Sequence, residues 1–170
     1  MARAAVSAAA LAGTAAAAAA LGLLLSGCGF HLEGHTALPA AVKRPYLEVV
    51  DRQSDFVQSL TRALLMNGAE LAERKDQASA VVSILKDNLH PRVLSVSNLN
   101  QPNEYELTYT VSFSVTAGEK ELLPPQELST TRTYSFDSRS LLAKGHEADI
   151  LRGAMAHDLA DMVMRRLARL

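Results

Sequence analysis

The residue with the most distinctive chemistry in this sequence is Cys28, the only cysteine. It closes the tetrapeptide Leu25-Ser26-Gly27-Cys28, which follows a long apolar run. A thiol can serve as a nucleophile or as a point of covalent attachment. With no second cysteine, an intramolecular disulfide is excluded, so side-chain packing must hold the fold together.

The segment before Cys28 has the composition of an export signal. Residues 4–25 carry no charge, consist mostly of alanine and leucine, and follow a single basic residue, Arg3. A basic start, an apolar stretch and small residues before a cleavage point are typical of secretory signals. The tetrapeptide matches the bacterial lipobox, which implies that the Cys28 thiol is lipidated and that Cys28 becomes the first residue of the mature chain. The attached groups would then be an N-acyl chain and an S-diacylglycerol.

Two alternatives compete with lipidation. Residues 4–25 could form an uncleaved transmembrane helix, because about 20 apolar residues suffice to cross a bilayer. Cys28 could instead be an ordinary buried thiol. Alanine contributes little transfer free energy, however, and an unpaired cysteine in an exported protein would be a reactive leftover. We therefore interpret residues 1–27 as a cleaved signal peptide.

The histidines and serines do not form a recognisable catalytic or metal-binding pattern. His31 and His35 are four residues apart, but they lie in a glycine-containing stretch, and no cysteine or third histidine follows at ligand spacing. No serine lies in a Gly-x-Ser-x-Gly motif, and no glycine-rich phosphate loop is present. We expect no enzyme, no metal site and no cofactor other than the lipid on Cys28.

Charge and aromatic content exclude further classes of protein. The formal charge is −1, and it becomes −2 when the signal is removed, because Arg3 is the only charged residue there. A nucleic-acid-binding protein would need a strongly basic balance. Tryptophan is absent and other aromatic residues are few, which argues against a site that works by stacking.

The first half of the remaining chain predicts a strand, a helix and a second strand. Residues 46–50 form a short apolar run bounded by Pro45. Ser54 is a suitable N-cap for a helix that should end at Asn67 and Gly68. Residues 78–85 alternate as a strand, which His90 and Pro91 should break or bulge before it resumes at residues 92–97. If the first two strands pair in parallel, the helix makes a right-handed crossover.

The second half contains the clearest pattern. Residues 104–116 alternate without interruption between apolar and polar residues, as expected for a strand with one buried face and one wet face. Residues 127–136 should form its partner strand. Arg132 falls on the expected apolar face of that strand, so it either lies past the sheet edge or has a specific role. A long amphipathic helix should follow at about residues 147–167.

These elements predict an α+β fold in which two helices pack on one face of a four-stranded sheet that is mixed or mainly antiparallel. Residues 28–44 should form the lipidated N-terminus and a tether, and residues 45–170 a single α+β domain. A chain of this length suits one hydrophobic core.

Several short stretches resemble the LptE family of lipopolysaccharide-assembly lipoproteins. They are similar in order and spacing and run through most of the chain after the signal: Cys28-Gly29-Phe30-His31-Leu32, Leu65-Met66-Asn67-Gly68-Ala69-Glu70-Leu71, Glu104-Tyr105, Tyr134-Ser135-Phe136-Asp137 and Leu142-Ala143-Lys144. The fold of that family, two helices against a four-stranded sheet, agrees with the fold predicted from the residues.

The resemblance implies a non-catalytic role in the outer membrane. Members of the family plug the lumen of the large outer-membrane barrel LptD, help it to assemble and contact lipopolysaccharide on its way to the outer leaflet. The lipid on Cys28 would hold the protein on the periplasmic side of the outer membrane, in the inner leaflet. Gly29 after the lipidated cysteine fits sorting to the outer membrane.

The resemblance also points to cations for lipopolysaccharide binding. The family places one basic residue in the turn before the Glu-Tyr strand and another in the Leu-Ala-Lys segment. Lys144 matches the second, but the first position falls near Asn98, in a turn without lysine or arginine. Binding would then involve Arg92, Arg132 or Arg139, because arginine and lysine bind lipid A phosphates by charge-assisted hydrogen bonds. Each of these four residues has the alternative of being a solvated surface charge.

Contact with the barrel is expected on the polar face of residues 104–116. Thr108, Thr110 and Ser112 would face the polar lumen, with plain solvent exposure as the alternative. A competing function is an auxiliary lipoprotein of an envelope lipid-transport system that acts outside a barrel. Such a shuttle would need a closed apolar cavity, against which the alternation of residues 104–116 argues.

Overall fold

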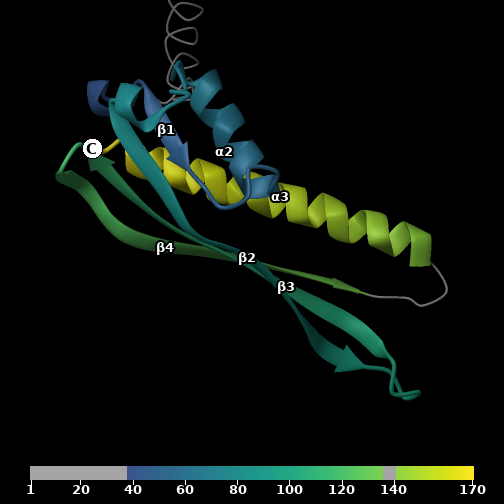
Figure 1. Ribbon diagram of the computed structural model, residues 1–170. Helices are drawn as coiled ribbons and strands as arrows, with labels where there is room; N and C mark the ends of the chain where they lie inside the picture. The colour runs from purple at the N-terminus through teal and green to yellow at the C-terminus, as the bar shows by residue number, and fades with distance from the viewer. Residues whose placement is uncertain (1–37, 136–140) are drawn as a thin grey trace, which may run out of the picture. The chain divides into compact units, whose positions relative to one another are not determined.

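The computed structural model describes residues 38–135 and 141–170, and in helix α3 it describes side chains from Glu147 onward. The elements in chain order are η1 (Ala40–Val42), β1 (Pro45–Glu48), α2 (Asp55–Met66), η2 (Lys75–Gln77), β2 (Ala80–Val96), β3 (Pro102–Ala117), β4 (Lys120–Ser135) and α3 (Leu141–Leu167). The sheet order is β1-β2-β3-β4. β1 pairs with β2 in parallel, and the other two pairings are antiparallel. Both helices lie on one face of the sheet (Figure 1), which confirms the predicted α+β fold.

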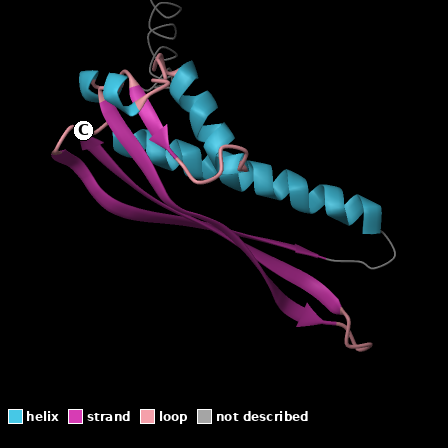
Figure 2. Cartoon of the chain, in the orientation of Figure 1, coloured by secondary structure: helices cyan, strands magenta, loops and turns pink. Residues whose placement is uncertain are grey.

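Helix α2 begins and ends at the predicted residues. The Ser54 hydroxyl accepts a hydrogen bond of 3.1 Å from the Val57 amide, which satisfies one of the free N–H groups of the first turn. Gly68, which follows the C-cap Asn67, has φ +79°, a conformation that glycine adopts without steric cost. The helix connects parallel strands β1 and β2 (Figure 2), as a crossover connection requires.

The predicted interruption of β2 at His90 and Pro91 is wrong. β2 is continuous over 17 residues, and Pro91 pairs with Leu107 of β3. The register shifts instead between Ile84 and Lys86 and again after Val93. β1 pairs with β2 from Ala80 to Ser83 and not beyond. At Pro91, therefore, no described strand pairs with the side of β2 that faces away from β3, and this side is a sheet edge. Proline is tolerated there because no neighbouring strand needs its missing N–H.

β4 and α3 both begin earlier than predicted. β4 starts at Lys120 rather than at residue 127, and Pro124 and Pro125 lie inside it. Leu123 pairs with Val115 and Gln126 pairs with Phe113, so β4 has one more residue than β3 between these two pairs. This extra residue forms a β-bulge, which accommodates the two prolines on an edge strand. α3 starts at Leu141, so the segment around Lys144 lies in its first turns and not before it.

The core lies between the helices and the inner face of the sheet, the face on which the helices pack. The alternation of residues 104–116 is confirmed, because the odd-numbered residues from Leu107 to Val115 are all buried. They pack against buried residues of both helices, including Phe56, Leu60, Leu64, Met155, Leu159 and Val163. Leu38 and Val42 also belong to this core, so the packed domain includes residues that precede the expected boundary at residue 45.

Candidate functional site

The face of the sheet opposite the helices, here called the outer face, carries Thr108, Thr110 and Ser112. All three are half-buried. The register places them in three polar rows across β2, β3 and β4: His90-Thr108-Thr131, Asn88-Thr110-Ser129 and Lys86-Ser112-Glu127. The Thr110 and Ser129 hydroxyls are hydrogen-bonded at 3.2 Å, and Lys86 forms an ion pair with Glu127 at 3.2 Å. The described helices leave this face uncovered (Figure 1).

Arg132 lies on the inner face of β4, opposite Leu107 of β3. Its Nη2 atom is 2.7 Å from Oδ2 of Asp158 on α3. The predicted exception in the apolar pattern therefore has a structural role, because the ion pair joins the edge strand to the long helix. Both side chains are partly exposed at the margin of the core.

The four cations proposed from the sequence do not form one cluster in the part of the chain that the structure describes. Arg92 lies on the outer face of β2, where its Nη2 atom is 2.9 Å from Oε1 of Glu106. Arg92 and Arg132 are consequently on opposite faces of the sheet. Lys144 lies in the first turns of α3 without a described side chain, and Arg139 and Cys28 lie outside the described residues.

The tip of the β2–β3 hairpin, residues 93–101, carries an exposed apolar surface. Exposed apolar side chains gather there: Val93, Leu94, Val96 and Leu99. The turn closes through backbone hydrogen bonds from the Ser97 amide to the Gln101 carbonyl (2.7 Å) and from the Asn100 amide to the Ser97 carbonyl (2.9 Å). The tip contains no lysine or arginine; Arg92, the residue before it, pairs with Glu106.

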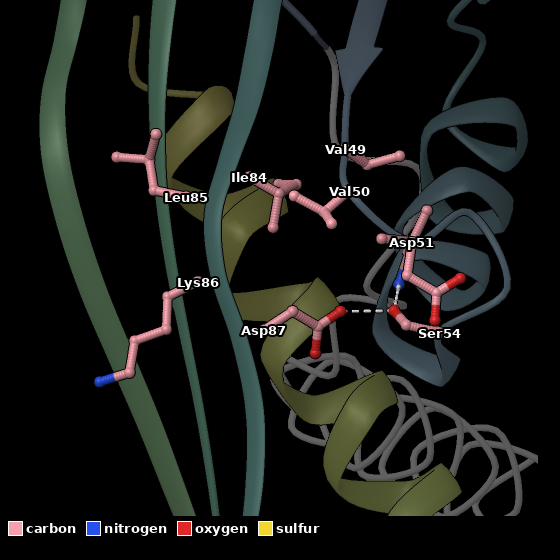
Figure 3. A pocket seen from close by; sticks show the side chains of 9 residues that line it. Val49, Val50, Asp51, Ser54, Ile84, Leu85, Lys86 and Asp87 are labelled. Carbon is pink, nitrogen blue, oxygen red and sulfur yellow. Dashed lines mark hydrogen bonds between the residues drawn. The ribbon is translucent and has the colours of Figure 1, made fainter.

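A cleft of about 300 Å³ opens where β1 ends and the chain turns away from β2. We call it the edge cleft; it is lined by Val49, Val50, Asp51, Ser54, Val57, Ile84, Leu85, Lys86 and Asp87. Figure 3 shows Lys86 pointing away from Asp87 and Ser54, toward the opposite side of β2.

Asp87 joins three elements beside the edge cleft. Its Oδ1 atom accepts a hydrogen bond of 2.9 Å from the Tyr109 hydroxyl of β3. Its Oδ2 atom accepts one from Ser54 (Figure 3), the residue that caps α2. Burial, reinforced by Asp87, raises the pKa of the Tyr109 phenol well above its ordinary value. The sequence did not reveal this site, because Asp87 lies in the polar run Lys86-Asp87-Asn88, where a carboxylate is an ordinary residue.

Within the described residues, no three histidine, cysteine or acidic side chains gather in a way that could hold a metal ion. No helix among the described residues is long and apolar enough to cross a membrane.

Taken together, the fold and its surfaces define a small α+β domain with helices on one sheet face and a polar, uncovered opposite face. A family model described as "LptE: Lipopolysaccharide-assembly" matches residues 42–167. This match covers most of the chain, which therefore belongs to the LptE family.

Individual relatives and solved structures agree with this assignment. The LPS-assembly lipoprotein LptE of Pectobacterium atrosepticum is 27% identical over 150 residues, covering 85% of this chain and 79% of its own. The Yersinia pestis protein of the same name is 26% identical over 148 residues, covering 85% and 70%. Rare lipoprotein B of Shewanella oneidensis has a similar structure, with a TM-score of 0.64, 26% identity and coverage of 74% and 94%. Lipoprotein B of Nitrosomonas europaea gives a TM-score of 0.68, 25% identity and coverage of 82% and 90%.

Proposed function

We propose that this protein is a non-catalytic, lipid-anchored subunit that binds inside an LptD-type outer-membrane barrel. There it assists assembly of the barrel and the insertion of lipopolysaccharide into the outer leaflet. Relatives over most of the chain are named LPS-assembly lipoproteins, and the family is described by an assembly role rather than by a reaction. Cys28 carries the lipid that anchors the protein to the inner leaflet of the outer membrane.

The observation that carries this proposal is the polar outer face. A sheet face that packs against another protein core is apolar, whereas the three rows on the outer face consist of hydroxyl, amide, imidazole and paired charged side chains. The lumen of an outer-membrane barrel is itself polar. Side chains such as Thr108, Thr110 and Ser112 can exchange hydrogen bonds with lumen residues or through bridging waters.

Lipopolysaccharide contact is assigned to cations at the end of the domain that includes Arg92 and the start of α3. Lipid A phosphates are anionic and bind arginine and lysine by charge-assisted hydrogen bonds. Arg92 and Lys144 are the stronger candidates, with Arg139 as a further one. Arg92 and Arg132 are paired with Glu106 and Asp158, so the use of either by a ligand would require its ion pair to open. Arg132, unlike Arg92, also lies on the inner face of the sheet beside α3.

The experiment is a pull-down of the full-length lipoprotein from its native envelope in mild detergent, followed by mass spectrometry. The proposal predicts a stoichiometric large barrel protein in the eluate. Recovery of the chain alone, or together with inner-membrane transporter subunits only, would contradict it and favour an auxiliary transport role outside a barrel.

A further inference from the structure

The edge of β2 that faces away from β3 is unpaired over most of its length among the described residues. β1 covers this edge only from Ala80 to Ser83, while β2 continues to Val96. Unpaired strand edges present rows of N–H and C=O groups that can pair with another polypeptide. The free edge begins where the edge cleft opens, since Leu85, Lys86 and Asp87 line that cleft.

Pro91 indicates which backbone groups of β2 face the free edge. Backbone groups of consecutive residues in an antiparallel pair point alternately toward the partner strand and away from it. Proline has no N–H to donate, so Pro91 fits a position that points away from β3. Leu89 and Asp87, two and four residues earlier without an intervening register shift, then also point outward, while Asn88 and His90 point toward β3.

The side chains around this edge favour a particular kind of occupant. Val50 is fully exposed and lines the cleft together with the apolar Val57 and Ile84. The Leu85 side chain, 55% exposed, points to the same side of β2 as Lys86 (Figure 3). Leu85 is the extra residue of the bulge between Ile84 and Lys86, with no partner on β3. The cleft can therefore take an apolar side chain that arrives from outside.

The charges at the cleft are mainly negative. Asp51 and Asp87 line it, whereas the lining cation Lys86 points to the outer face (Figure 3). There Lys86 pairs with Glu127. Asp55 follows the lining residue Ser54, and its Oδ2 atom lies 4.0 Å from Nε of Arg152, which partly balances its charge. A basic side chain close to the incoming apolar one would complement Asp51.

We propose that an extended segment of a partner polypeptide adds to the sheet as a strand along β2 from Leu85 to His90, with an apolar side chain in the edge cleft and a neighbouring lysine or arginine near Asp51. Strand addition of this kind derives affinity from main-chain hydrogen bonds and specificity from side-chain pockets. Pro91 ends the pairing on one side and Glu48, the last residue of β1, limits it on the other. The proposal rests on the proposed function for the partner, which is the barrel protein.

Residue-resolved amide hydrogen exchange on the full lipoprotein, alone and co-purified with its barrel, tests the pairing. The Asp87 and Leu89 amides should exchange rapidly in the free protein and at least tenfold more slowly in the complex. The Asn88 and His90 amides should be protected in both states, because they bond to β3. An intact complex in which Asp87 and Leu89 still exchange rapidly would overturn strand addition and leave the proposed function standing. Absence of any barrel would overturn both.

A second test substitutes exposed residues, which can be changed without loss of core packing. The variant V50D places a charge at the mouth of the cleft and should reduce the co-purified barrel at least tenfold. The matched control I150D changes an exposed apolar residue of α3 and should retain it. Equal recovery with both variants, in protein whose unfolding transition is unchanged, would contradict the proposal.

Discussion

The Tyr109 hydroxyl donates a hydrogen bond of 2.9 Å to Asp87, and the same carboxylate accepts from Ser54 at the start of α2. One aspartate therefore connects the centre of the sheet to the first turn of a helix. Tyr109 is only 3% exposed, so its hydroxyl has little access to water as an alternative partner.

Substitution of Asp87 by alanine should destabilise the domain. The buried Tyr109 hydroxyl would lose its acceptor, and leaving such a group unsatisfied costs roughly 1–3 kcal/mol. Urea unfolding followed by circular dichroism measures the change. D76A is a suitable control, because Asp76 forms only an exposed pair with Arg74 and its loss should cost less than about 1 kcal/mol. Equal losses of unfolding free energy in D87A and D76A would show that the Asp87 hydrogen bonds do not stabilise the domain.

The stability of the domain should fall at alkaline pH through Tyr109. Its pKa is raised in the folded state by burial and then by Asp87, so the unfolded chain ionises first, at about pH 10. This contribution is fully present below that pH and is lost as pH rises toward the higher folded pKa. Urea midpoints between pH 8 and 11 should decline less steeply for Y109F than for the native chain. Parallel declines would contradict this account.

Two glycines should respond to alanine in opposite directions. Gly68 has φ +79°, and nothing lies within 4 Å of an added Cβ, so G68A should cost about 1 kcal/mol for conformational reasons alone. Gly153 is inside α3, again with no atom within 4 Å of an added Cβ, and G153A should stabilise by up to about 1 kcal/mol. Thermal unfolding of both variants measures the sign of each change in stability. Changes of the same sign would show that backbone conformation does not determine the effect of alanine at these positions.

Removal of single cations should weaken lipopolysaccharide binding unequally. R92Q and K144Q should each lose about 1 kcal/mol of binding free energy, which is roughly fivefold in Kd. R132Q should instead lower stability slightly, by less than about 1 kcal/mol, because Arg132 is joined to Asp158. Binding of purified lipopolysaccharide, measured beside urea unfolding, separates the two effects. If only R132Q weakened lipopolysaccharide binding, Arg132 rather than Arg92 or Lys144 would be the binding cation.

The fold was predictable where the local sequence pattern and the tertiary packing favour the same secondary structure. The alternation of residues 104–116 and the cap at Ser54 are both local signals, and both are confirmed. The break predicted at Pro91 is wrong because proline interrupts a strand only where its N–H would be needed. Pro91, Pro124 and Pro125 lie on edges or bulges, and sheet order, which decides where an edge falls, is not encoded locally.

The candidate site was predictable in part for the same reason. The polar face of β3 follows from period two alone, so Thr108, Thr110 and Ser112 could be placed on one surface. The partner of Arg132 could not be found, because Asp158 is 26 residues away and meets it only when α3 packs on the sheet. The edge cleft depends on where β1 stops pairing, which is again a property of the assembled sheet.

The most direct test of the central claim is site-specific photo-cross-linking in the native envelope, with the reactive residue at Thr110 on the outer face and, for comparison, at Gln58 on the exposed surface of α2. If the outer face lies against the barrel lumen, Thr110 should give a strong cross-link to a large outer-membrane barrel protein. Cross-links to the barrel from Gln58 but none from Thr110, or no barrel product from either position, would contradict it.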